Sequence, residues 1–457
     1  MTRVLSRPGG ATSCSTEPKW SFARPVERLL LAGMYGVVVL APLTLIAGAM
    51  KPGAQGTLIV FADVLGFVAL SLLALQVVVS GRWAGTTRSF GLRPVLSLHR
   101  QAGMAVLVLV VVHVVVLLLD DPTRLALFDP RTAPPRARAG VLALLGLVAL
   151  AGTSVWRRRL RMSYERWRGV HLGCTALVIA AAFAHVVWVD AYTSLPVVRW
   201  SVLALVLAAA VALFWTRVAR PYATVLRPYR VLAVRRERGD AVTIELAADG
   251  HDGLRFAPGQ FARLRGADCM YGMGDHPFSL SSSAQRPHRP EFTVKALGDF
   301  SASLADLRVG TEVLVDGPHG EGVHEARAVR GRILLAAGIG ITPALSVLRT
   351  AAERGERRPI LLLYGSRHWA AVTFRVELDE LQRQLNLRVV HVLSRPEPGW
   401  RGERGRLGEE LVRRYAPRDV AGWSALVCGP SAMVAEAASA LQRLGLPRTA
   451  IQAEGFE

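Results

Sequence analysis

The sequence predicts an all-α membrane bundle of six helices, followed by a β-barrel domain and an α/β domain with a parallel sheet. Three observations predict this order: long apolar segments before residue 219, short alternating strands after residue 221, and strand–helix repeats from about residue 332. With 457 residues, the chain is long enough for two or three domains. We expect a tail over residues 1–26, a membrane domain over 27–219, a barrel over 226–326 and an α/β domain over 327–457.

Six apolar segments are long enough to cross a bilayer, which takes roughly 20 residues in a helix. They cover residues 28–49, 57–79, 95–119, 139–156, 169–189 and 200–218. The polar residues before them lack the apolar core and cleavage site of a signal peptide. We therefore interpret the first 26 residues as a tail that precedes an uncleaved first span, and the protein as an integral membrane protein that contacts lipid.

The loops between the spans predict the orientation in the membrane. The 80–94 loop carries three arginines and the 157–168 loop carries six, whereas the alternate loops are poorer in positive charge. Positively charged loops stay on the cytoplasmic side. We expect six spans in the plasma (inner) membrane, with both termini and the whole soluble half in the cytoplasm.

The net charge and the cysteine content argue against nucleic-acid binding and against sites built from several cysteines. The net charge of +20 comes largely with arginines that lie between apolar segments, which favours membrane orientation over nucleic-acid binding. We expect no nucleic-acid partner. The four cysteines form no CxxC pair, so the sequence does not support a disulfide framework, a zinc knuckle or an iron–sulfur cluster held by four cysteines.

The spans contain four histidines at matching positions in two helices. His99 and His113 lie in the third span and His171 and His185 in the fifth, each pair 14 residues apart. This spacing is roughly 21 Å along a helix and leaves both side chains facing nearly the same way. Because the two spans run in the same direction, His99 should lie level with His171 near the inner face, and His113 with His185 near the outer face. Such pairs are typical of axial haem ligands, so we expect two bis-histidine b-type haems; hydrogen bonding between helices is the alternative.

After residue 221 the pattern changes twice. Short alternating segments such as 229–237, 241–247 and 291–297 predict a small antiparallel barrel. From residue 332, apolar strands alternate with amphipathic helices, which predicts a parallel sheet with helices on its faces.

The soluble half contains five short motifs in chain order. They are His276-Pro277-Phe278-Ser279-Leu280-Ser281-Ser282, Gly298-Asp299-Phe300-Ser301, Gly317-Pro318-His319-Gly320, Ala337-Gly338-Ile339-Gly340-Ile341-Thr342-Pro343 and Cys428-Gly429-Pro430. These motifs resemble those of the ferredoxin–NADP reductase superfamily, and more narrowly those of its ferric reductase and NADPH oxidase branch. The six spans and the histidine pairs resemble that branch too, so the resemblance covers roughly residues 28–457. His319 stands where the family has tyrosine, and we assign it no role.

The resemblance implies FAD in the barrel and a nicotinamide nucleotide in the α/β domain. Hydroxyls and backbone N–H groups of residues 279–282 suit flavin edges and phosphate, and Gly338 and Gly340 allow close approach of a pyrophosphate. Arg367 ends the second strand of the α/β domain, where a cation favours the 2′-phosphate of NADPH over NADH. The family's late aromatic residue covers the flavin ring, and Phe456 is the candidate. The cofactor-binding residues implied are His276, Pro277, Phe278, Ser279, Leu280, Ser281, Ser282, Gly298, Ser301, Gly338, Gly340, Thr342, Pro343, Ser366, Arg367, Cys428, Gly429, Pro430 and Phe456.

Together, these features predict a flavocytochrome that moves electrons from NADPH through FAD, the inner haem and the outer haem to an acceptor outside the membrane. Cofactors carry this chemistry, so we assign no general base or nucleophile. Ferric chelates, dioxygen and quinone-like molecules are the candidate acceptors. We favour a ferric-reductase-type or quinone-like acceptor because no further outer histidine remains to position oxygen. The alternatives are a superoxide-generating NADPH oxidase and a haem-binding membrane subunit that donates electrons to a periplasmic protein partner.

Overall fold

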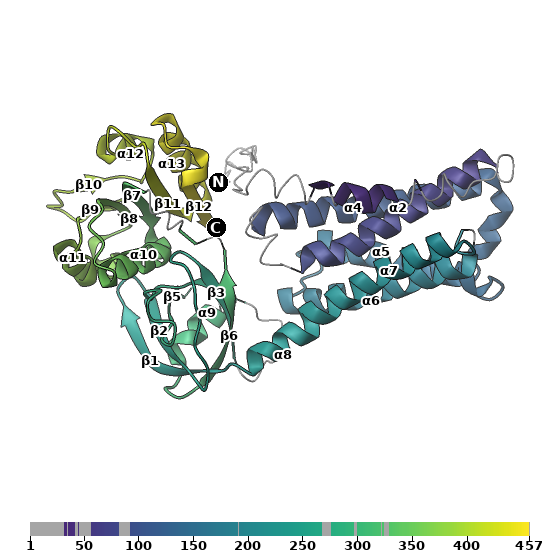
Figure 1. Ribbon diagram of the computed structural model, residues 1–457, viewed down its shortest axis with the longest axis horizontal. Coiled ribbons are helices and arrows are strands. Elements are labelled where there is room, and N and C mark those ends of the chain that lie inside the picture. The colour runs from purple at the N-terminus through teal and green to yellow at the C-terminus, as the bar shows by residue number, and fades with distance from the viewer. Residues whose placement is uncertain are drawn as a thin grey trace, which may run out of the picture.

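The computed structural model describes residues 32–33, 35–41, 44, 56–81, 92–190, 192–266, 276–296, 299–320, 322–323 and 329–456. A helical bundle forms one half of an elongated molecule, and two domains with β-sheets form the other half (Figure 1). We call the end of the bundle beside these domains the near end, and the opposite end the far end.

Long apolar helices build the bundle. They are α2 (Thr57–Ser80), α4 (Leu92–Asp120), α5 (Pro135–Val155), α6 (Tyr164–Val189) and α7 (Pro196–Phe214), with the short 3-10 helix η1 (Pro122–Phe128) after α4. Within the described residues, five helices are long and apolar enough to span a membrane. The predicted first span, residues 28–49, lies largely outside the described residues, as does the predicted tail, so the expected number of six spans stays a prediction.

Local sequence explains where these helices begin. Pro135 and Pro196 open α5 and α7, at positions where a helix needs no backbone N–H. The Ser163 side chain caps α6 by accepting from the N–H of Arg166. Large apolar side chains on the bundle surface, such as Trp200 at 68% exposure and Leu119 at 71%, are costly in water and suit lipid.

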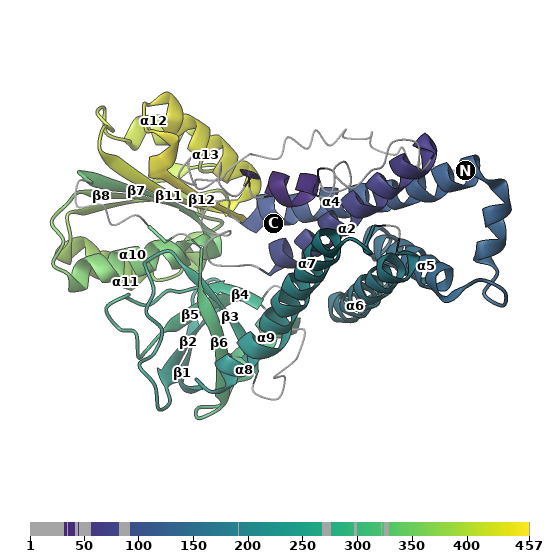
Figure 2. The same cartoon turned by 45° about the vertical axis from the view of Figure 1, so that its right-hand side comes forward.

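The bundle consists of two packed helix pairs. α2 packs along α4, and α5 packs along α6, with α7 against α2. At the near end α7 continues through a π-helical turn (Trp215–Ala219) into α8 (Arg220–Val225), which reaches the barrel (Figure 2).

The first soluble domain is a six-stranded antiparallel barrel. Its strands are β1 (Tyr229–Glu237), β2 (Ala241–Ala248), β3 (Phe261–Gly266), β4 (His276–Ser279), β5 (Glu291–Lys295) and β6 (Glu312–His319), with the short α9 (Asp299–Ser303) before β6. The order is β4-β3-β6-β1-β2-β5, and a bridge between Leu280 and Phe292 links the two ends. Ile244, Leu246 and Phe292 fill its core.

The second soluble domain is a six-stranded parallel sheet between two helical layers. Its strands are β7 (Gly331–Ala337), β8 (Ile360–Ser366), β9 (Leu387–Leu393), β10 (Glu403–Arg404), β11 (Trp423–Pro430) and β12 (Ile451–Phe456). The order β10-β9-β8-β7-β11-β12 places the reversal of strand order at β7. The helices α10 (Ile341–Glu353) and α11 (Arg375–Gln384) cover one face, and α12 (Glu409–Tyr415) and α13 (Ser431–Arg443) cover the other (Figure 2).

Candidate functional site

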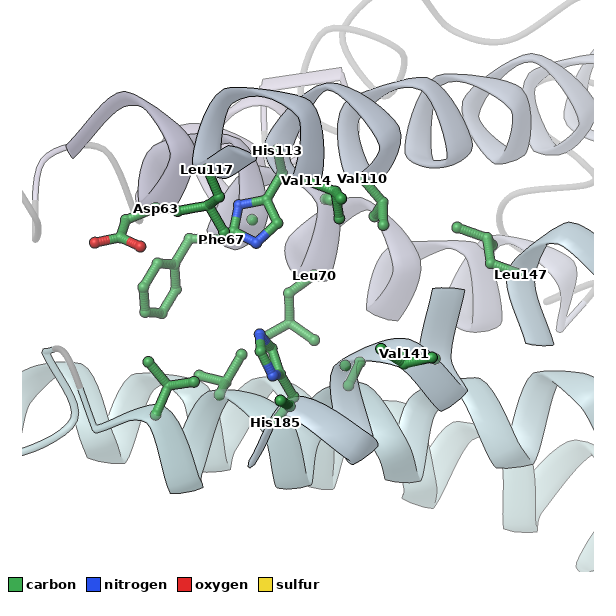
Figure 3. Close-up of a pocket in the computed structure, with 18 of the residues that line it drawn as sticks. Asp63, Phe67, Leu70, Val110, His113, Val114, Leu117, Val141, Leu147 and His185 are labelled. Carbon is green, nitrogen blue, oxygen red and sulfur yellow. The ribbon is translucent and has the colours of Figure 1, made fainter. Parts of the chain in front are cut away.

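A cavity of about 210 Å³ lies between the two helix pairs toward the far end of the bundle. His113 on α4 and His185 on α6 point into it from opposite sides (Figure 3). His113 Nδ1 lies 2.7 Å from the carbonyl oxygen of Ala62, and His185 Nδ1 lies 2.8 Å from that of Arg136. A carbonyl oxygen only accepts, so each Nδ1 carries the proton and each Nε2 keeps a lone pair for a metal.

Glycines make room for both of these rings. A Cβ added to Gly140 on α5 would lie 2.8 Å from His185 Nδ1, and one added to Gly66 on α2 would lie 3.4 Å from His113. The Gly140 distance is shorter than real Cβ contacts, so even alanine would displace the His185 ring. The cavity therefore depends on a small residue behind each histidine.

The second histidine pair lies at the near end. The His99 and His171 rings are 6.2 Å apart between centroids. His171 Nδ1 contacts the Ser154 hydroxyl at 3.3 Å, and the Trp167 ring lies 5.1 Å from the His171 ring. His99 Nδ1 is buried and has no hydrogen-bond partner among the described residues. The structure thus brings the four histidines together in the two pairs expected from their spacing.

Two charged residues near these pairs escaped the sequence analysis. Asp63 lines the far-end cavity from α2, inside a helix apolar enough to span a membrane. An acidic residue in such a segment is itself a functional signal. The guanidinium group of Arg217 is close enough to interact electrostatically with both His99 and His171.

The predicted flavin stretch runs along β4 and out of the barrel. The His276 ring stacks on Phe300 with centroids 3.9 Å apart, and Phe278 stacks on the same ring at 6.2 Å. The second predicted segment therefore packs against the first. Gly298 lies outside the described residues.

Two residues of this stretch use their polar groups inside the protein. The Leu280 N–H donates to the Gln260 carbonyl, and the Ser281 N–H donates to the Glu291 carbonyl. The Ser281 hydroxyl, fully buried, accepts from Thr293, and its carbonyl accepts from Arg349 of α10. The N–H groups of Leu280 and Ser281 therefore donate to protein carbonyls, whereas the Ser281 hydroxyl still has a proton to donate. Flavin binding by these two residues stays a prediction.

Ser282 differs from these neighbours. Its hydroxyl is buried and has no hydrogen-bond partner among the described residues, while its carbonyl accepts from Ser346. Buried hydroxyls are normally paired, so this orphaned donor fits a bound ligand. Ser279, at the end of β4, is half-buried.

The predicted nucleotide loop follows β7, at the reversal of strand order where α/β sheets bind ligands. Gly338 has φ +54°, and a Cβ on Gly340 would meet the Cys428 carbonyl oxygen at 2.4 Å. Only glycine at residue 340 therefore lets the loop approach β11. Thr342 and Pro343 are buried, and the Thr342 hydroxyl donates to the Ile339 carbonyl. Burial raises the pKa of the Cys428 thiol well above its usual value, so this cysteine stays neutral beside the loop.

Two arginines meet beside the end of β8. Arg367 is exposed directly after the strand, and its carbonyl accepts from the N–H of Arg395, 2.8 Å away, which follows β9. Ser366 has a buried hydroxyl without a hydrogen-bond partner among the described residues. Sequence analysis missed Arg395; an arginine just after the third strand of the domain was the available signal.

Phe456 ends a strand that was not predicted. β12 pairs with β11 so that Phe456 lies opposite Pro430, next to Gly429. Phe456 therefore lies at the carboxyl ends of the parallel strands, and the nucleotide loop follows the carboxyl end of β7 at the same side of the sheet. Ser301 lies in α9, next to the stacked Phe300.

One charged cluster joins the bundle to the barrel. Arg220 of α8 contacts Asp316 of β6 at 3.0 Å, and Arg263 and His319 lie 3.6 and 3.4 Å from the same carboxylate. Burial raises the pKa of Asp316, but the hydrogen bond from His319 and the two guanidinium groups outweigh burial and hold that pKa well below its usual range. His319, without a role in the sequence analysis, belongs to this junction.

Comparisons with known proteins match both halves of the chain. Residues 65–183 match the family described as ferric reductase like transmembrane component, and residues 334–439 match the oxidoreductase NAD-binding domain. The chain joins a ferric reductase-like transmembrane component to an oxidoreductase NAD-binding domain. In the ferric reductase-like component, His99, His113 and His171 lie within the matched residues, and His185 lies just past them.

Curated relatives match the soluble half. NADH-cytochrome b5 reductase 1 of Pyricularia oryzae is 29% identical over 36% of this chain and 56% of its own length, and that of Ajellomyces capsulatus is 31% identical over 37% and 58%. The chain thus spans just over half the length of these relatives. A solved ferredoxin NADP+ reductase from Neisseria gonorrhoeae with bound FAD and NADP is 22% identical, covering 50% of this chain and 98% of that one, with a TM-score of 0.43.

The histidine pairs of the ferric reductase-like component fit axial ligation of haem. Two metal–nitrogen bonds of roughly 2 Å, plus roughly 1 Å from each nitrogen to its ring centre, add up to about 6 Å. The His99–His171 centroid distance of 6.2 Å agrees with this sum. At the far end, the two imidazoles with free Nε2 atoms face a shared apolar cavity. Among the described residues no group of three or more His, Cys, Asp or Glu could hold a bare metal ion.

Proposed function

We propose that the protein is a membrane flavocytochrome that passes electrons from NADPH, by way of FAD and two b-type haems, to an acceptor beyond the far end of the bundle. One observation carries the proposal. The two histidine pairs connect α4 and α6 at two levels, in a chain that joins a ferric reductase-like component to an NAD-binding domain. When bound, the cofactors supply hydride acceptance and one-electron transfer.

The chain's own residues bind and orient these groups. His99 with His171, and His113 with His185, would hold one haem each, and the Ala62 and Arg136 carbonyls fix the far-end rings. Aliphatic side chains make up most of the lining of the cavity that the far-end pair faces. Arg217 supplies positive charge near the near-end pair.

In the soluble half, separate residues would serve flavin and nucleotide. Ser279 and Ser282 offer hydroxyls to FAD, and the His276–Phe300 stack supports that site. The Gly338–Gly340 turn lets a pyrophosphate approach the backbone at the start of α10. Arg367 and Arg395 would favour the 2′-phosphate of NADPH, and Phe456 would cover the flavin.

The arginine-rich loops support a cytoplasmic soluble half and an acceptor on the outer side of the plasma (inner) membrane. A ferric-reductase-type or quinone-like acceptor is favoured over dioxygen. The test is NADPH turnover by purified protein, with and without oxygen, using ferric EDTA and a superoxide probe. Anaerobic reduction of the haem by NADPH, followed by reduction of ferric EDTA, supports the proposal. Superoxide as the main product would favour the oxidase alternative, and haem that NADPH cannot reduce would contradict the proposal.

A further inference from the structure

The far-end cavity has one polar rim on an otherwise apolar wall. Asp63, Arg124 and Tyr192 lie in its lining, whereas the remaining lining, apart from the two histidines, is aliphatic or aromatic. Figure 3 shows Asp63 at one end of the cavity, beyond Phe67, and Leu147 at the opposite end. The rim therefore lies to one side of the His113–His185 pair.

Asp63 lies in this rim because of its place on α2, and no hydrogen bond within the described residues fixes its side chain. Its electrostatic neighbours are Arg124, His185 and Tyr192. Arg124 itself is fixed from the segment after α4, since it contacts Asp120 at 2.9 Å and donates to the Leu117 carbonyl. A carboxylate in a helix apolar enough to span a membrane is costly to keep, which indicates a function.

Aromatic rings surround this polar rim. Phe67 and Tyr192 meet edge to face with centroids 6.1 Å apart, and Phe128 of η1 joins the lining. A hydrated, charged ferric chelate would bind weakly to such an aromatic lining, because it would lose bound water and form no hydrogen bonds with the rings in return. A flat, uncharged molecule with polar oxygens matches both the rings and the Arg124 guanidinium.

We infer that this rim binds a lipophilic quinone-class acceptor and that Asp63 donates protons to it; the inference rests on the proposed function. Reduction of a quinone takes two electrons and two protons. A haem held by His113 and His185 would supply the electrons one at a time. Both carbonyl oxygens become hydroxyls. Asp63 passes each proton in turn to a carbonyl oxygen and regains one from water at the far end. The other titratable or charged groups facing Asp63 are His113 from α4, His185 from α6, Arg124 and Tyr192.

Asp63→Asn tests this inference, because asparagine keeps the size and polarity but carries no transferable proton. Asp129→Asn is the matched control, an exposed acid beyond the same end of the bundle whose carboxylate accepts from the Arg131 N–H. The probes are decylubiquinone and ferric EDTA, both with NADPH. We expect Asp63→Asn to lower decylubiquinone turnover at least about tenfold, as loss of a proton donor does. Haem content and ferric EDTA turnover should both stay within about twofold of the wild-type values, because neither requires a proton donor.

A second readout does not depend on turnover. The redox-induced infrared difference spectrum of the wild type should contain a protonated carboxyl band that Asp63→Asn removes and Asp129→Asn keeps. Should Asp63→Asn lose haem, Asp63→Glu, which retains a carboxyl group, must keep the band and most of the quinone turnover. Equal effects on quinone and ferric EDTA, or a wild type that reduces ferric EDTA but not decylubiquinone, would overturn the inference alone. A wild type without NADPH-reducible haem would overturn the proposed function.

Discussion

Arg220 and Asp316, 96 residues apart in sequence, connect the helices of the bundle to the antiparallel barrel. The Arg220 Nε and Nη2 atoms both donate to Asp316 Oδ1, at 3.2 and 3.0 Å. Because α8 continues directly from α7, this contact fixes the barrel at the end of the bundle where His99 and His171 lie. Distance controls electron transfer, so the junction should control the step from flavin to the near-end site.

Asp316→Asn should loosen this junction. Removing one partner of a buried ion pair leaves uncompensated cations and typically costs about 3–5 kcal/mol. We expect slower haem reduction in stopped-flow experiments, with unchanged reduction of FAD by NADPH. Asp249→Asn is the control, since its exposed pair with Arg230 is screened by solvent and contributes little to stability. Equal haem reduction rates in both variants would remove the junction from the electron path.

Gly140→Ala should disturb the far-end pair selectively. The new methyl group would lie 2.8 Å from His185 Nδ1, so the ring must move away from the Arg136 carbonyl. We expect loss or a shifted spectrum of one of two haems. Gly173→Ala on α6 is the control, because nothing lies within 4 Å of its new methyl group. Identical haem spectra for the two variants would argue against this cavity as a haem site.

Arg367→Asp should shrink the preference for NADPH over NADH, and Arg367→Asp with Arg395→Asp should abolish it. A charge-assisted hydrogen bond contributes about 1.5–3 kcal/mol, or roughly ten- to a hundredfold in kcat/KM. Steady-state kinetics with both nucleotides measures the ratio. Arg308→Ala, an exposed residue on the barrel, should leave the ratio alone. An unchanged ratio in the double variant would exclude both arginines.

Ser279→Ala combined with Ser282→Ala should weaken FAD retention, since each lost hydroxyl costs about 1–3 kcal/mol where a buried partner is left unpaired. Haem content should stay at the wild-type value. Ser439→Ala on α13, whose hydroxyl donates to the Ala435 carbonyl in its own helix, is the control. Full FAD occupancy after purification of the double variant would place the flavin elsewhere.

The features that depend on local sequence pattern could be predicted from the sequence. Apolar length marked the helices, the 14-residue spacing paired the histidines, and the Gly338–Gly340 loop followed an apolar strand as expected. Contacts between residues that are far apart in the sequence could not be predicted in this way. Asp63 is a single acid in an apolar run, and the partner of Arg220 lies on a strand of another domain. A motif also does not show which polar groups the barrel itself uses, such as the N–H groups of Leu280 and Ser281, which donate to protein carbonyls.

The four histidines test the central claim most directly. Purified wild type should carry two haems per chain with bis-histidine spectra, both reduced by NADPH. His113→Ala or His185→Ala should leave about one haem, because each site needs both of its axial ligands. That remaining haem should still be reduced, while delivery to an impermeant acceptor collapses. His99→Ala or His171→Ala should stop electrons at the flavin. Two intact bis-histidine haems in His113→Ala, or none in the wild type, would contradict the flavocytochrome account and leave a membrane-tethered flavin reductase.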